Sequence, residues 1–531
     1  MGFCFRSTRC RVILRSLKKR SAARVAGEFF TPKICTVTMF VFFVSVLSNR
    51  TVLHGAGAHR ADARKGVQSA RYALVCMTTL TRRSFFAASL AAAAPNQARP
   101  NFIVLYTDDQ GIGDLGCYGA KDVRTPHLDR LAERGVRFTN WYSNSPVCSP
   151  SRAALMTGLY PHRTGIRNFL PGHSARDVPG LRPTEVTLPG LLKQAGYRTA
   201  AVGKWHLGST PPSRPLRQGF DEFFGFYSGW IDNYSHRYYQ MTAGNPQEIY
   251  HDLWRNETEA WEEPVYHTEL FTREAKRFLE RQKAGMPFFL YLAYGAPHYP
   301  MIAPQKYIDR FPSTMDPDRR LHAAMLAAVD DSVGELVAVL QRRGLDQNTV
   351  VFFQSDNGAT NESRSDSRGR PYRGGSNAPF RGYKGGLFEG GIRMPALLSW
   401  PAGVPSGRVP SGRVVHAPGA TMDILPTFLE WAGVPAVPVD GRSVSAMVKT
   451  NAASPHEALY WEYQKQFAIR QGDWKLMQSA TTGLGERSPA ARWLSNLKAD
   501  PAETENWADR EPAQVERLER LLEEWKGTTG A

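Results

Sequence analysis

Residues 101–106 (NFIVLY) form an uninterrupted apolar stretch that is followed, after one threonine, by Asp108 and Asp109. A short apolar run rich in branched and aromatic side chains is typical of a strand buried on both faces of a sheet. Carboxylates at the end of such a strand are costly to bury unless they bind something. We therefore expect a central strand whose carboxyl end opens into a polar site.

The same arrangement occurs three more times along the chain. Residues 198–202, 288–292 and 349–353 are candidates for buried strands, and polar side chains follow each within a few positions. In an open α/β sheet the carboxyl ends of the strands border the binding crevice. We expect the side chains behind the four strands to converge there: Asp108 and Asp109, Lys204 and His206, His298, and Asp356 and Asn357.

Helical segments separate these strands. One is predicted from Thr125 and Pro126 to Gly135, and another over residues 187–195. A long amphipathic helix should precede Gly344, because apolar side chains recur every three or four positions at Leu321, Met325, Val329, Val333, Leu336 and Leu340. Strands that alternate with helices predict an α/β fold with a mostly parallel sheet covered on both faces.

The pattern changes after about residue 400. Strand-like segments follow at 458–463, 466–470 and 473–478. The last helix carries one apolar stripe made of Val515, Leu518, Leu521, Leu522 and Trp525. We expect a catalytic domain over residues 99–440 and a smaller α+β domain over residues 441–531.

The chain has 531 residues and a formal net charge of +17, which would suggest a nucleic-acid partner if the charge were evenly spread. Residues 1–76, however, contain 14 Lys and Arg against two acidic residues, whereas the remaining 455 residues contain 52 against 47. We therefore expect no nucleic-acid partner. Four of the six cysteines also lie in this leader, and Cys117 and Cys148 alone do not make a disulfide framework.

Two export-like signals compete near the N terminus. Residues 34–48 form an apolar run of 15, slightly short for a spanning helix. After Met77, the pair Arg82 and Arg83 precedes two phenylalanines and an alanine-rich run, which resembles a bacterial twin-arginine signal. We expect a start at Met77, a signal over residues 77–98, and an exported, periplasmic or extracellular protein that lacks residues 1–76 and has no stable membrane span. A membrane anchor at 34–48 is the alternative.

The residue types at the strand ends suit a metal ion and an oxyanion. Hard oxygen ligands, which favour Ca²⁺ or Mg²⁺ over zinc, would come from Asp108, Asp109, Asp356 and Asn357. Positive charge for an oxyanion with more than one negative oxygen would come from Arg152, Lys204, His206 and Lys384. Together they predict an anionic ester, a sulfate or a phosphate, as the substrate.

An isolated cysteine in a chain body without disulfides is normally a small buried hydrophobe. Cys148 instead begins CSPSRAALMTG (148–158), which resembles the sulfatase signature Cys-x-Pro-Ser-Arg followed by Thr-Gly. A second sulfatase-type signature joins GYRT (196–199) to GKWH (203–206), and the likeness continues through NAPFRGYKG (377–385). From about Asn101 onward the chain is identified as a member of the type I sulfatase family, arylsulfatase-like, with similarity to N-acetylgalactosamine-6-sulfatase-type enzymes.

The resemblance implies an alkaline-phosphatase-like α/β/α sandwich and a sulfuric ester hydrolase. It implies that a separate maturase oxidises Cys148 to formylglycine (3-oxoalanine), whose hydrate is the nucleophile. It also implies a calcium ion, with magnesium as the alternative, that polarises the sulfate oxygens. The implied metal ligands are Asp108, Asp109, position 148, Asp356 and Asn357.

The resemblance also assigns roles to the cationic side chains. Arg152 and Lys204 would hold and activate the hydrate, and Lys384 and His298 would reach the sulfate ester. His298 is expected to protonate the leaving alcohol. His206 is expected to help the second hydroxyl of the hydrate to expel sulfate.

The substrate is less directly indicated. Ser228, within GFYS (225–228), is expected as a further sulfate contact. Residues 209–270 are dense in side chains that can stack on sugar rings, namely Trp230, Tyr234, His236, Tyr238, Tyr239, Trp254 and Trp261. A sulfated carbohydrate is therefore preferred to a steroid or simple aryl sulfate. The alternatives are a phosphonate or phosphodiester hydrolase on the same scaffold and a non-catalytic sulfated-glycan-binding protein, which would be expected to lack Cys148 or a metal carboxylate.

Overall fold

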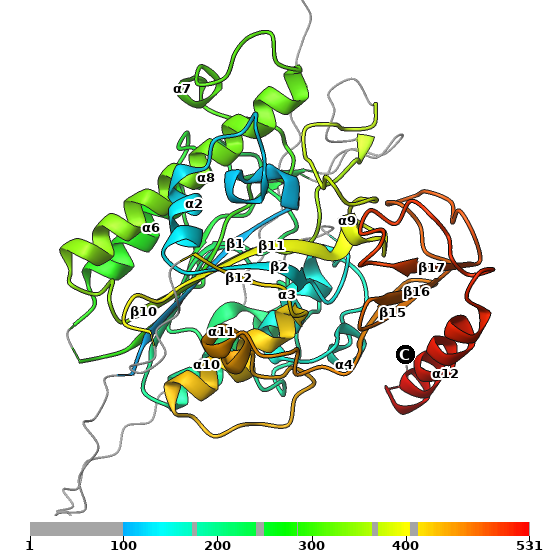
Figure 1. The fold of residues 1–531 in the computed structure, drawn as a ribbon. Helices are drawn as coiled ribbons and strands as arrows, with labels where there is room; N and C mark the ends of the chain where they lie inside the picture. Colours follow the sequence, from blue (N-terminus) through cyan, green and yellow to red (C-terminus); the bar gives the residue numbers. More distant parts are fainter. Residues whose placement is uncertain are drawn as a thin grey trace, which may run out of the picture. The chain divides into compact units, whose positions relative to one another are not determined.

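The first predicted strand lies at the centre of a large sheet (Figure 1). β1 (Asn101–Thr107) is flanked by β10 (Thr349–Ser355) and β9 (Phe288–Ala293), both parallel to it. β9 pairs in turn with β3 (Arg198–Lys204), and β3 with β4 (Glu222–Phe226), again in parallel. The four strands predicted from the sequence therefore have their carboxyl ends at the same edge of one sheet.

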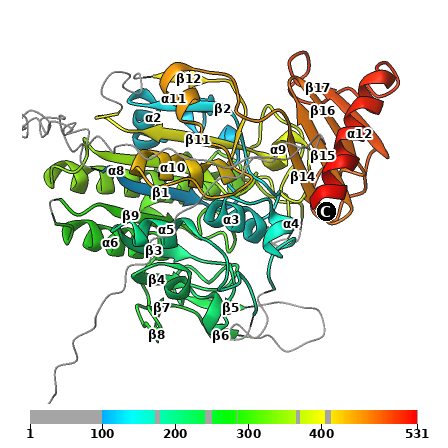
Figure 2. The ribbon, with the colours of Figure 1, turned by 90° about the horizontal axis from the view of Figure 1, so that it is seen from below.

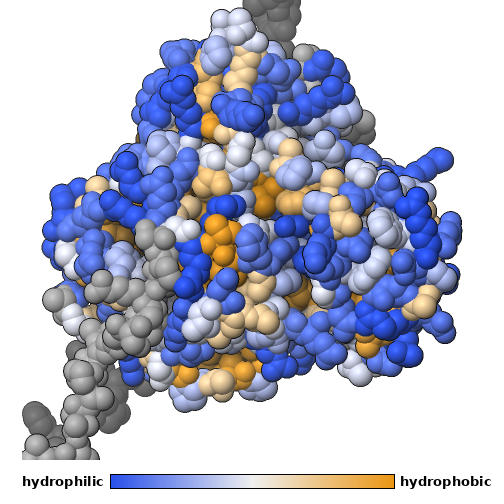
Figure 3. All heavy atoms as spheres, viewed as in Figure 1, coloured by the Kyte–Doolittle hydropathy of each residue, from blue (hydrophilic) through white to orange (hydrophobic). Residues whose placement is uncertain are grey.

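The computed structural model describes residues 99–171, 178–239, 249–283, 285–363, 370–403 and 412–529. The predictions for 1–76, for 34–48 and for the signal at 77–98 lie outside these residues and remain predictions. Within the described part of the chain, no helix is long and apolar enough to cross a membrane. The face drawn in Figure 3 is mainly hydrophilic, with hydrophobic residues in small groups.

The sheet becomes antiparallel beyond β10. β11 (Arg393–Ser399) runs against β10, and β2 (Val136–Tyr142) runs against β11. Neither strand was predicted from the sequence. Pro395 interrupts β11, and the alternation of apolar and polar residues in β2 is short, because Thr139 and Asn140 are both polar. The pairing register shifts between Met394 and Ala396, on either side of the proline. The sheet as a whole is mixed and mostly parallel, as predicted.

Short strands complete the edges of the sheet. Their order is β12-β2-β11-β10-β1-β9-β3-β4-β7-β8, with β13 beside β2. These edge strands are β12 (Arg413–Val415), β13 (Gly419–Ala420), β7 (Trp254–Arg255) and β8 (Thr258–Glu259). A separate two-stranded ribbon consists of β5 (Arg237–Tyr239) and β6 (Ile249–His251).

Alternate side chains of β1 pack in two separate cores. Ile103 and Leu105 belong to a cluster with helices α2 (Pro126–Glu133), α6 (His267–Glu280) and α8 (Pro317–Arg342). Phe102 and Val104 belong to another cluster with α3 (Cys148–Thr157), α5 (Leu188–Gln194), α10 (Ile424–Ala432) and α11 (Ser445–Thr450). The two helix layers lie on opposite sides of the sheet in Figure 1, which confirms the predicted α/β/α sandwich.

A smaller antiparallel sheet follows near the C terminus (Figure 2). Its strands are β14 (Leu459–Tyr463), β15 (Gln466–Gln471), β16 (Trp474–Gln478) and β17 (Arg492–Asn496), of which the first three were predicted. α12 (Pro512–Thr529) packs Val515, Leu518 and Leu522 against it. The same core includes Leu387 and Phe388, so the small sheet packs against the segment that follows Lys384.

Candidate active site

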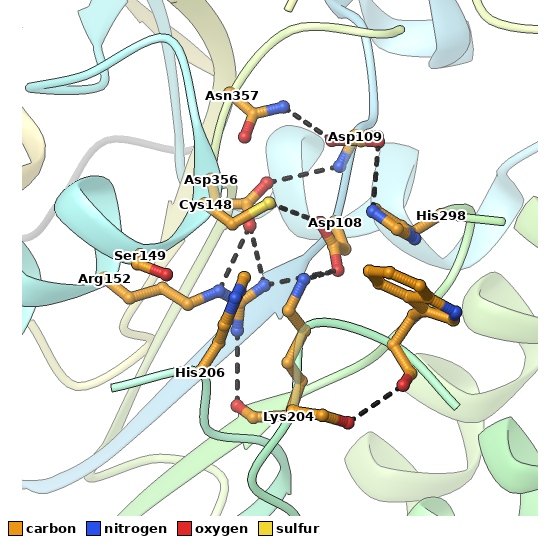
Figure 4. A network of polar contacts seen from close by, with 12 residues as sticks. Asp108, Asp109, Cys148, Ser149, Arg152, Lys204, His206, His298, Asp356 and Asn357 are labelled. Atoms are coloured by element: carbon orange, nitrogen blue, oxygen red, sulfur yellow. Dashed lines mark hydrogen bonds and ion pairs between the residues drawn. The ribbon is translucent and has the colours of Figure 1, made fainter. Parts of the chain in front are cut away.

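The polar clusters predicted behind four strands meet at the carboxyl edge of the large sheet. The Asp108 amide donates to the Ala296 carbonyl at 3.1 Å, and the Asp356 amide donates to the Thr107 carbonyl at 3.1 Å. The segments that follow β1, β9 and β10 therefore lie side by side. Figure 4 shows the labelled side chains from these segments gathered around Cys148, the first residue of α3.

The predicted oxygen ligands form one buried group. The Asp109 amide donates to Asp356 Oδ1 at 3.2 Å, and Asn357 Nδ2 donates to Asp109 Oδ1 at 2.7 Å. Asn357 Oδ1 is buried and receives no hydrogen bond from any described residue. A buried oxygen without a donor is costly, and a cation would satisfy it. The hard oxygens of Asp108, Asp109, Asp356 and Asn357 therefore fit Ca²⁺ or Mg²⁺.

Three buried carboxylates lie so close together that a cation between them would stabilise their charges, as their pKa values indicate. Burial raises the pKa of Asp108 to about 7, and the neighbouring charge of Asp356 adds to the effect. Burial likewise raises the pKa of Asp109. Burial alone would raise the pKa of Asp356 too, but attraction to Arg152 and other nearby cations lowers it. A bound divalent cation would favour the ionised form of all three.

Buried cations pair with each carboxylate. Arg152 donates to Asp356 Oδ2 from Nη2 at 2.7 Å and from Nε at 3.1 Å. Lys204 Nζ lies 2.5 Å from Asp108 Oδ2, and Lys384 Nζ lies 2.9 Å from Asp109 Oδ2. These pairs hold three positive charges next to the oxygen cluster, where a sulfate group would meet them.

Cys148 is buried beside this network, with only 2% of its surface exposed. Its Sγ lies 3.5 Å from Asp108 Oδ1. Burial raises the pKa of the Cys148 thiol well above its usual range, and the charge of Asp108 raises it further. Because the thiolate rather than the thiol is the nucleophile, the unmodified side chain is poorly suited to attack a substrate.

His206 presents one ring nitrogen as a proton acceptor. Its Nε2 lies 3.0 Å from the Leu170 carbonyl, which can only accept, so Nε2 carries the hydrogen. Nδ1 is buried and has no hydrogen-bond partner among the described residues. Burial, followed by the charge of Lys204, lowers the pKa of His206 well below its ordinary value. The ring is therefore neutral, with a free acceptor atom.

His298 has the opposite arrangement. Its Nδ1 lies 2.7 Å from the Tyr299 carbonyl and carries a hydrogen for the same reason. Nε2 faces Asp109 Oδ2 at 3.7 Å, which favours a proton on that nitrogen. His298 therefore has a carboxylate that stabilises its charged form, whereas His206 has none in the described network.

Two backbone conformations mark the same site. Asp109 has a φ of +61° and His206 a φ of +53°, in the left-handed region that non-glycine residues seldom occupy. Such conformations persist where the surroundings determine them, and they are common at functional sites.

Ser228 lies at the margin of the site. Its amide donates to Asp252 Oδ2 at 2.8 Å, and its hydroxyl donates to the Trp230 carbonyl at 2.9 Å. With His206 and Leu170 it lines a small cavity. Among the described residues, no polar contact joins Ser228 to Asp108, Asp109 or Asp356. Its role as a sulfate contact therefore remains a prediction.

The aromatic side chains of residues 209–270 mostly pack on one another. Trp230 lies 4.6 Å from Tyr238 and 5.2 Å from Tyr299, measured between ring centroids. Trp261 is 61% exposed, but it stacks on His251 at 3.9 Å. The described part of this insert therefore does not present a row of exposed rings. Packing within the insert is the commoner reason for such side chains, and stacking on sugars stays a prediction.

Sequence reasoning missed side chains that hold the network together. Tyr291, in β9, accepts a hydrogen bond from Arg152 Nη1 at 3.3 Å. Glu362 lies 3.5 Å from Lys384 Nζ. Asn377 donates to the carbonyls of Ala359 and Gly382 at 3.1 and 3.0 Å. A tyrosine inside an apolar strand was a visible signal for Tyr291, and Asn377 begins the sulfatase-like stretch NAPFRGYKG (377–385), but nothing in the local sequence marks Glu362.

Comparison with known proteins decides the family. The sulfatase family model matches residues 100–434. The chain belongs to the sulfatase family. A second model, that of the C-terminal region of N-sulphoglucosamine sulphohydrolase, matches residues 383–526. The predicted family is therefore confirmed, and the chain is a sulfuric ester hydrolase.

Individual relatives agree with this assignment. The sulfatase is 37% identical to N-acetylgalactosamine-6-sulfatase of Canis lupus familiaris over 410 residues, which cover 73% of each chain. It is 31% identical to arylsulfatase J of Mus musculus over 493 residues, 82% of this chain and 77% of that one. The crystal structure of Ps i-CgsB in complex with k-i-k-neocarrahexaose superposes with a TM-score of 0.69 at 32% identity, covering 80% of this chain and 92% of that one.

Proposed function

We propose that this sulfatase hydrolyses sulfate monoesters of carbohydrates, with formylglycine made from Cys148 as its nucleophile. The reaction consumes water and releases an alcohol and inorganic sulfate. The observation that carries the proposal is the buried, neutral Cys148, whose Sγ lies 3.5 Å from Asp108 Oδ1 among three carboxylates and their paired cations. A protonated thiol is a poor nucleophile, so catalysis from this position requires its conversion.

Two groups beyond the encoded side chains complete this chemistry. Formylglycine at position 148 would supply, as its hydrate, a hydroxyl nucleophile, and calcium or magnesium would polarise the sulfate oxygens. The residues that would hold the ion are Asp108, Asp109, Asp356 and Asn357, and the orphaned Asn357 Oδ1 supports this assignment. A separate maturase is the expected partner, because it would have to oxidise the thiol to the aldehyde.

The cations divide between the nucleophile and the ester. Arg152 pairs with Asp356, and Lys204 pairs with Asp108, whose Oδ1 lies 3.5 Å from Cys148 Sγ. These two cations would therefore hold the side chain at position 148. Lys384 Nζ and His298 Nε2 lie 2.9 and 3.7 Å from the same Asp109 oxygen. A sulfate oxygen and the ester oxygen placed next to them would therefore be contacted by both residues.

The two histidines would move protons in opposite directions. His298 Nε2, which lies 3.7 Å from Asp109 Oδ2, would in its protonated form donate a proton to the ester oxygen as the alcohol leaves. His206 Nδ1, neutral and without a described partner, would accept a proton from the nucleophile position when sulfate is expelled. Their different surroundings support an acid role for one and a base role for the other.

The carbohydrate part of the proposal rests on the relatives. One is named for its action on N-acetylgalactosamine 6-sulfate, and the Ps i-CgsB structure holds an oligosaccharide. Both proteins match this chain over most of their length. We therefore favour a sulfated sugar over an aryl sulfate.

The test is to express the chain together with a maturase and to measure hydrolysis of sulfated mono- and oligosaccharides, with phosphate and phosphonate esters as comparisons. Mass spectrometry of the peptide that contains residue 148 should show conversion of the cysteine to the aldehyde. Cys148→Ala should abolish turnover without unfolding the protein. Full activity with unmodified Cys148 would contradict the mechanism.

A further inference from the structure

The small C-terminal sheet reaches the active site through the backbone of Lys384. The Lys384 amide donates to the Ala359 carbonyl at 3.1 Å, and the Lys384 carbonyl accepts from the Leu484 amide at 3.1 Å. One residue earlier, the Tyr383 amide donates to the Thr482 carbonyl at 2.7 Å. Lys384 is therefore held between the loop that follows β10 and the loop that follows β16.

One buried side chain of the small sheet strengthens this attachment. Gln466, the first residue of β15, donates from Nε2 to the Gly385 carbonyl at 2.8 Å. Its Oε1 accepts from the Thr481 amide at 2.8 Å and from the Thr481 hydroxyl at 3.3 Å. Both ends of the amide are used, so Gln466 joins the Lys384 segment directly to residues 481–484.

Gly385, which receives this hydrogen bond, lies in closely packed surroundings. Its φ is +86°, and its amide donates at 2.9 Å to the carbonyl of Pro146, two residues before Cys148. A Cβ at this position would lie 2.4 Å from the side chain of Leu484. The Lys384–Gly385 unit is therefore fixed from three directions, by the loop after β10, by the loop before α3 and by the small sheet.

We propose that Gln466 is a positioning residue for the reaction, which places Lys384 Nζ for contact with the sulfate group. The inference rests on the proposed function, because it assigns Lys384 to the sulfate ester. The ammonium group of Lys384 reaches Asp109 Oδ2, at 2.9 Å, from a backbone that is held in this way, so a shift of the backbone would move the ammonium group relative to the carboxylates. A displacement of about 1 Å in an active site can cost about 10²-fold in rate.

The experiment compares three variants of the full chain. Gln466→Glu keeps the shape and the acceptor for Thr481 but removes the hydrogen bond to Gly385. Gln466→Met keeps the volume and removes both polar ends, in case the carboxylate prevents folding. Gln471→Ala is the matched control, because Gln471 is the last residue of the same strand and contacts Glu457 and Arg517 rather than the site.

We expect both Gln466 variants to lower kcat/KM about 10- to 100-fold, while calcium content and conversion of residue 148 stay unchanged. Inhibition by inorganic sulfate should weaken by a similar factor. In a Lys384→Ala background, Gln466→Glu should have no further effect, because the residue would act through Lys384. Gln471→Ala should leave these kinetic values unchanged.

The proposal would be overturned if Gln466→Glu lowered activity as much in the Lys384→Ala background as in the wild-type protein. Unchanged kinetics in both Gln466 variants would also overturn it. If the wild-type protein, shown to carry formylglycine, hydrolyses no sulfate ester, the proposed function is wrong. The positioning role is then judged by calorimetric binding of inorganic sulfate. Equal, non-additive losses in Gln466→Glu and Lys384→Ala would support it, and unchanged binding in Gln466→Glu would overturn it.

Discussion

The two halves of the site are positioned by different parts of the molecule. Asp108, Asp109 and Asp356 follow directly from β1 and β10, whose parallel register sets Thr107 opposite Ser355. We refer to these three residues with Asn357 as the strand-end half. His206, His298 and Lys384 form the loop half, because each lies on a loop beyond the strand ends. Their positions depend on contacts such as that of Lys384 with Leu484.

The two halves also differ in how firmly the fold holds them. Strands β1 and β10 are buried along their whole length, so the strand-end half is as rigid as the core. The loop half depends on hydrogen bonds from distant segments, including the small sheet through Gln466. Loops on a rigid scaffold are where binding properties change most readily. We infer that the proposed metal ligands are positioned by the strands, whereas the two histidines proposed to move protons and Lys384 are positioned by the loops.

The largest effect is expected in the strand-end half, from Asp356→Ala. The change removes a proposed metal ligand and leaves Arg152 buried without its closest carboxylate partner. We expect kcat/KM to fall by more than about 10³-fold and the free energy of unfolding to fall by about 3–5 kcal/mol. Elemental analysis should show reduced calcium retention. Glu335→Ala, which breaks a surface pair with Lys276, is the control. Undiminished activity and metal content in Asp356→Ala would refute the assignment.

His298→Ala should have a graded effect that depends on the leaving group. A sugar alcohol needs its oxygen protonated as the S–O bond breaks, and general acid catalysis is worth about 10²–10⁴-fold. We expect most of that loss on a carbohydrate sulfate and much less on nitrophenyl sulfate, which leaves without help. His206→Ala should slow both substrates in the later step that they share. An equal loss for both leaving groups in His298→Ala, with desulfation rate-limiting, would place the acid elsewhere.

The pH dependence of kcat should report the neutral state of His206. Burial and then Lys204 lower its pKa below the ordinary value of 6.5. Because protonation removes the acceptor at Nδ1, activity should fall only as the pH drops through this lowered pKa. We therefore expect the midpoint of the acid limb below pH 6.5 when sulfate release limits the rate. The prediction would be wrong if the midpoint lay at or above pH 6.5 and disappeared in His206→Gln, because the pKa of His206 would then not be lowered.

Tyr463→Phe should have the smallest effect, although Tyr463 also connects the small sheet to a loop beside the site. Its hydroxyl lies 3.2 Å from Asn168 Oδ1. The same loop is held independently by the hydrogen bond from the Leu170 amide to Ser149 Oγ at 3.0 Å. We expect a loss of about 1 kcal/mol in the free energy of unfolding and less than tenfold in kcat. Tyr460→Phe, on the same strand, is the control. If Tyr463→Phe lowered kcat as much as Gln466→Glu does, the contact of Tyr463 with Asn168 would be as important for the site as that of Gln466 with Gly385.

The strand-end half could be predicted because each of its parts is local in the sequence. An apolar stretch followed by Asp108 and Asp109, and another followed by Asp356 and Asn357, indicate both the strands and the polar edge. Parallel strands carry their carboxyl ends to the same edge, so the convergence follows from the fold class. The signature that begins at Cys148 indicates the family without any structure.

The residues of the loop half could be identified from the sequence, but the contacts that position them could not. Lys384 was identified by resemblance, yet nothing near it in the sequence indicates that Gln466, more than 80 positions later, holds its neighbour. The aromatic insert shows the reverse case, because a composition typical of sugar binding is largely used for internal packing, as in the contact of Trp230 with Tyr238. Composition does not tell whether a ring faces solvent or another ring.

The sequence by itself determined the family, the central parallel strands and the residues that follow them, because hydrophobic pattern and short motifs are local properties. Only the tertiary structure decided which strands run antiparallel at β2 and β11, which nitrogen of His206 carries a hydrogen, and how the small sheet holds Lys384. These depend on hydrogen bonds between segments that lie far apart in the chain. Such pairings arise only when the core has packed, since the partner of a buried polar group is whatever the fold brings next to it.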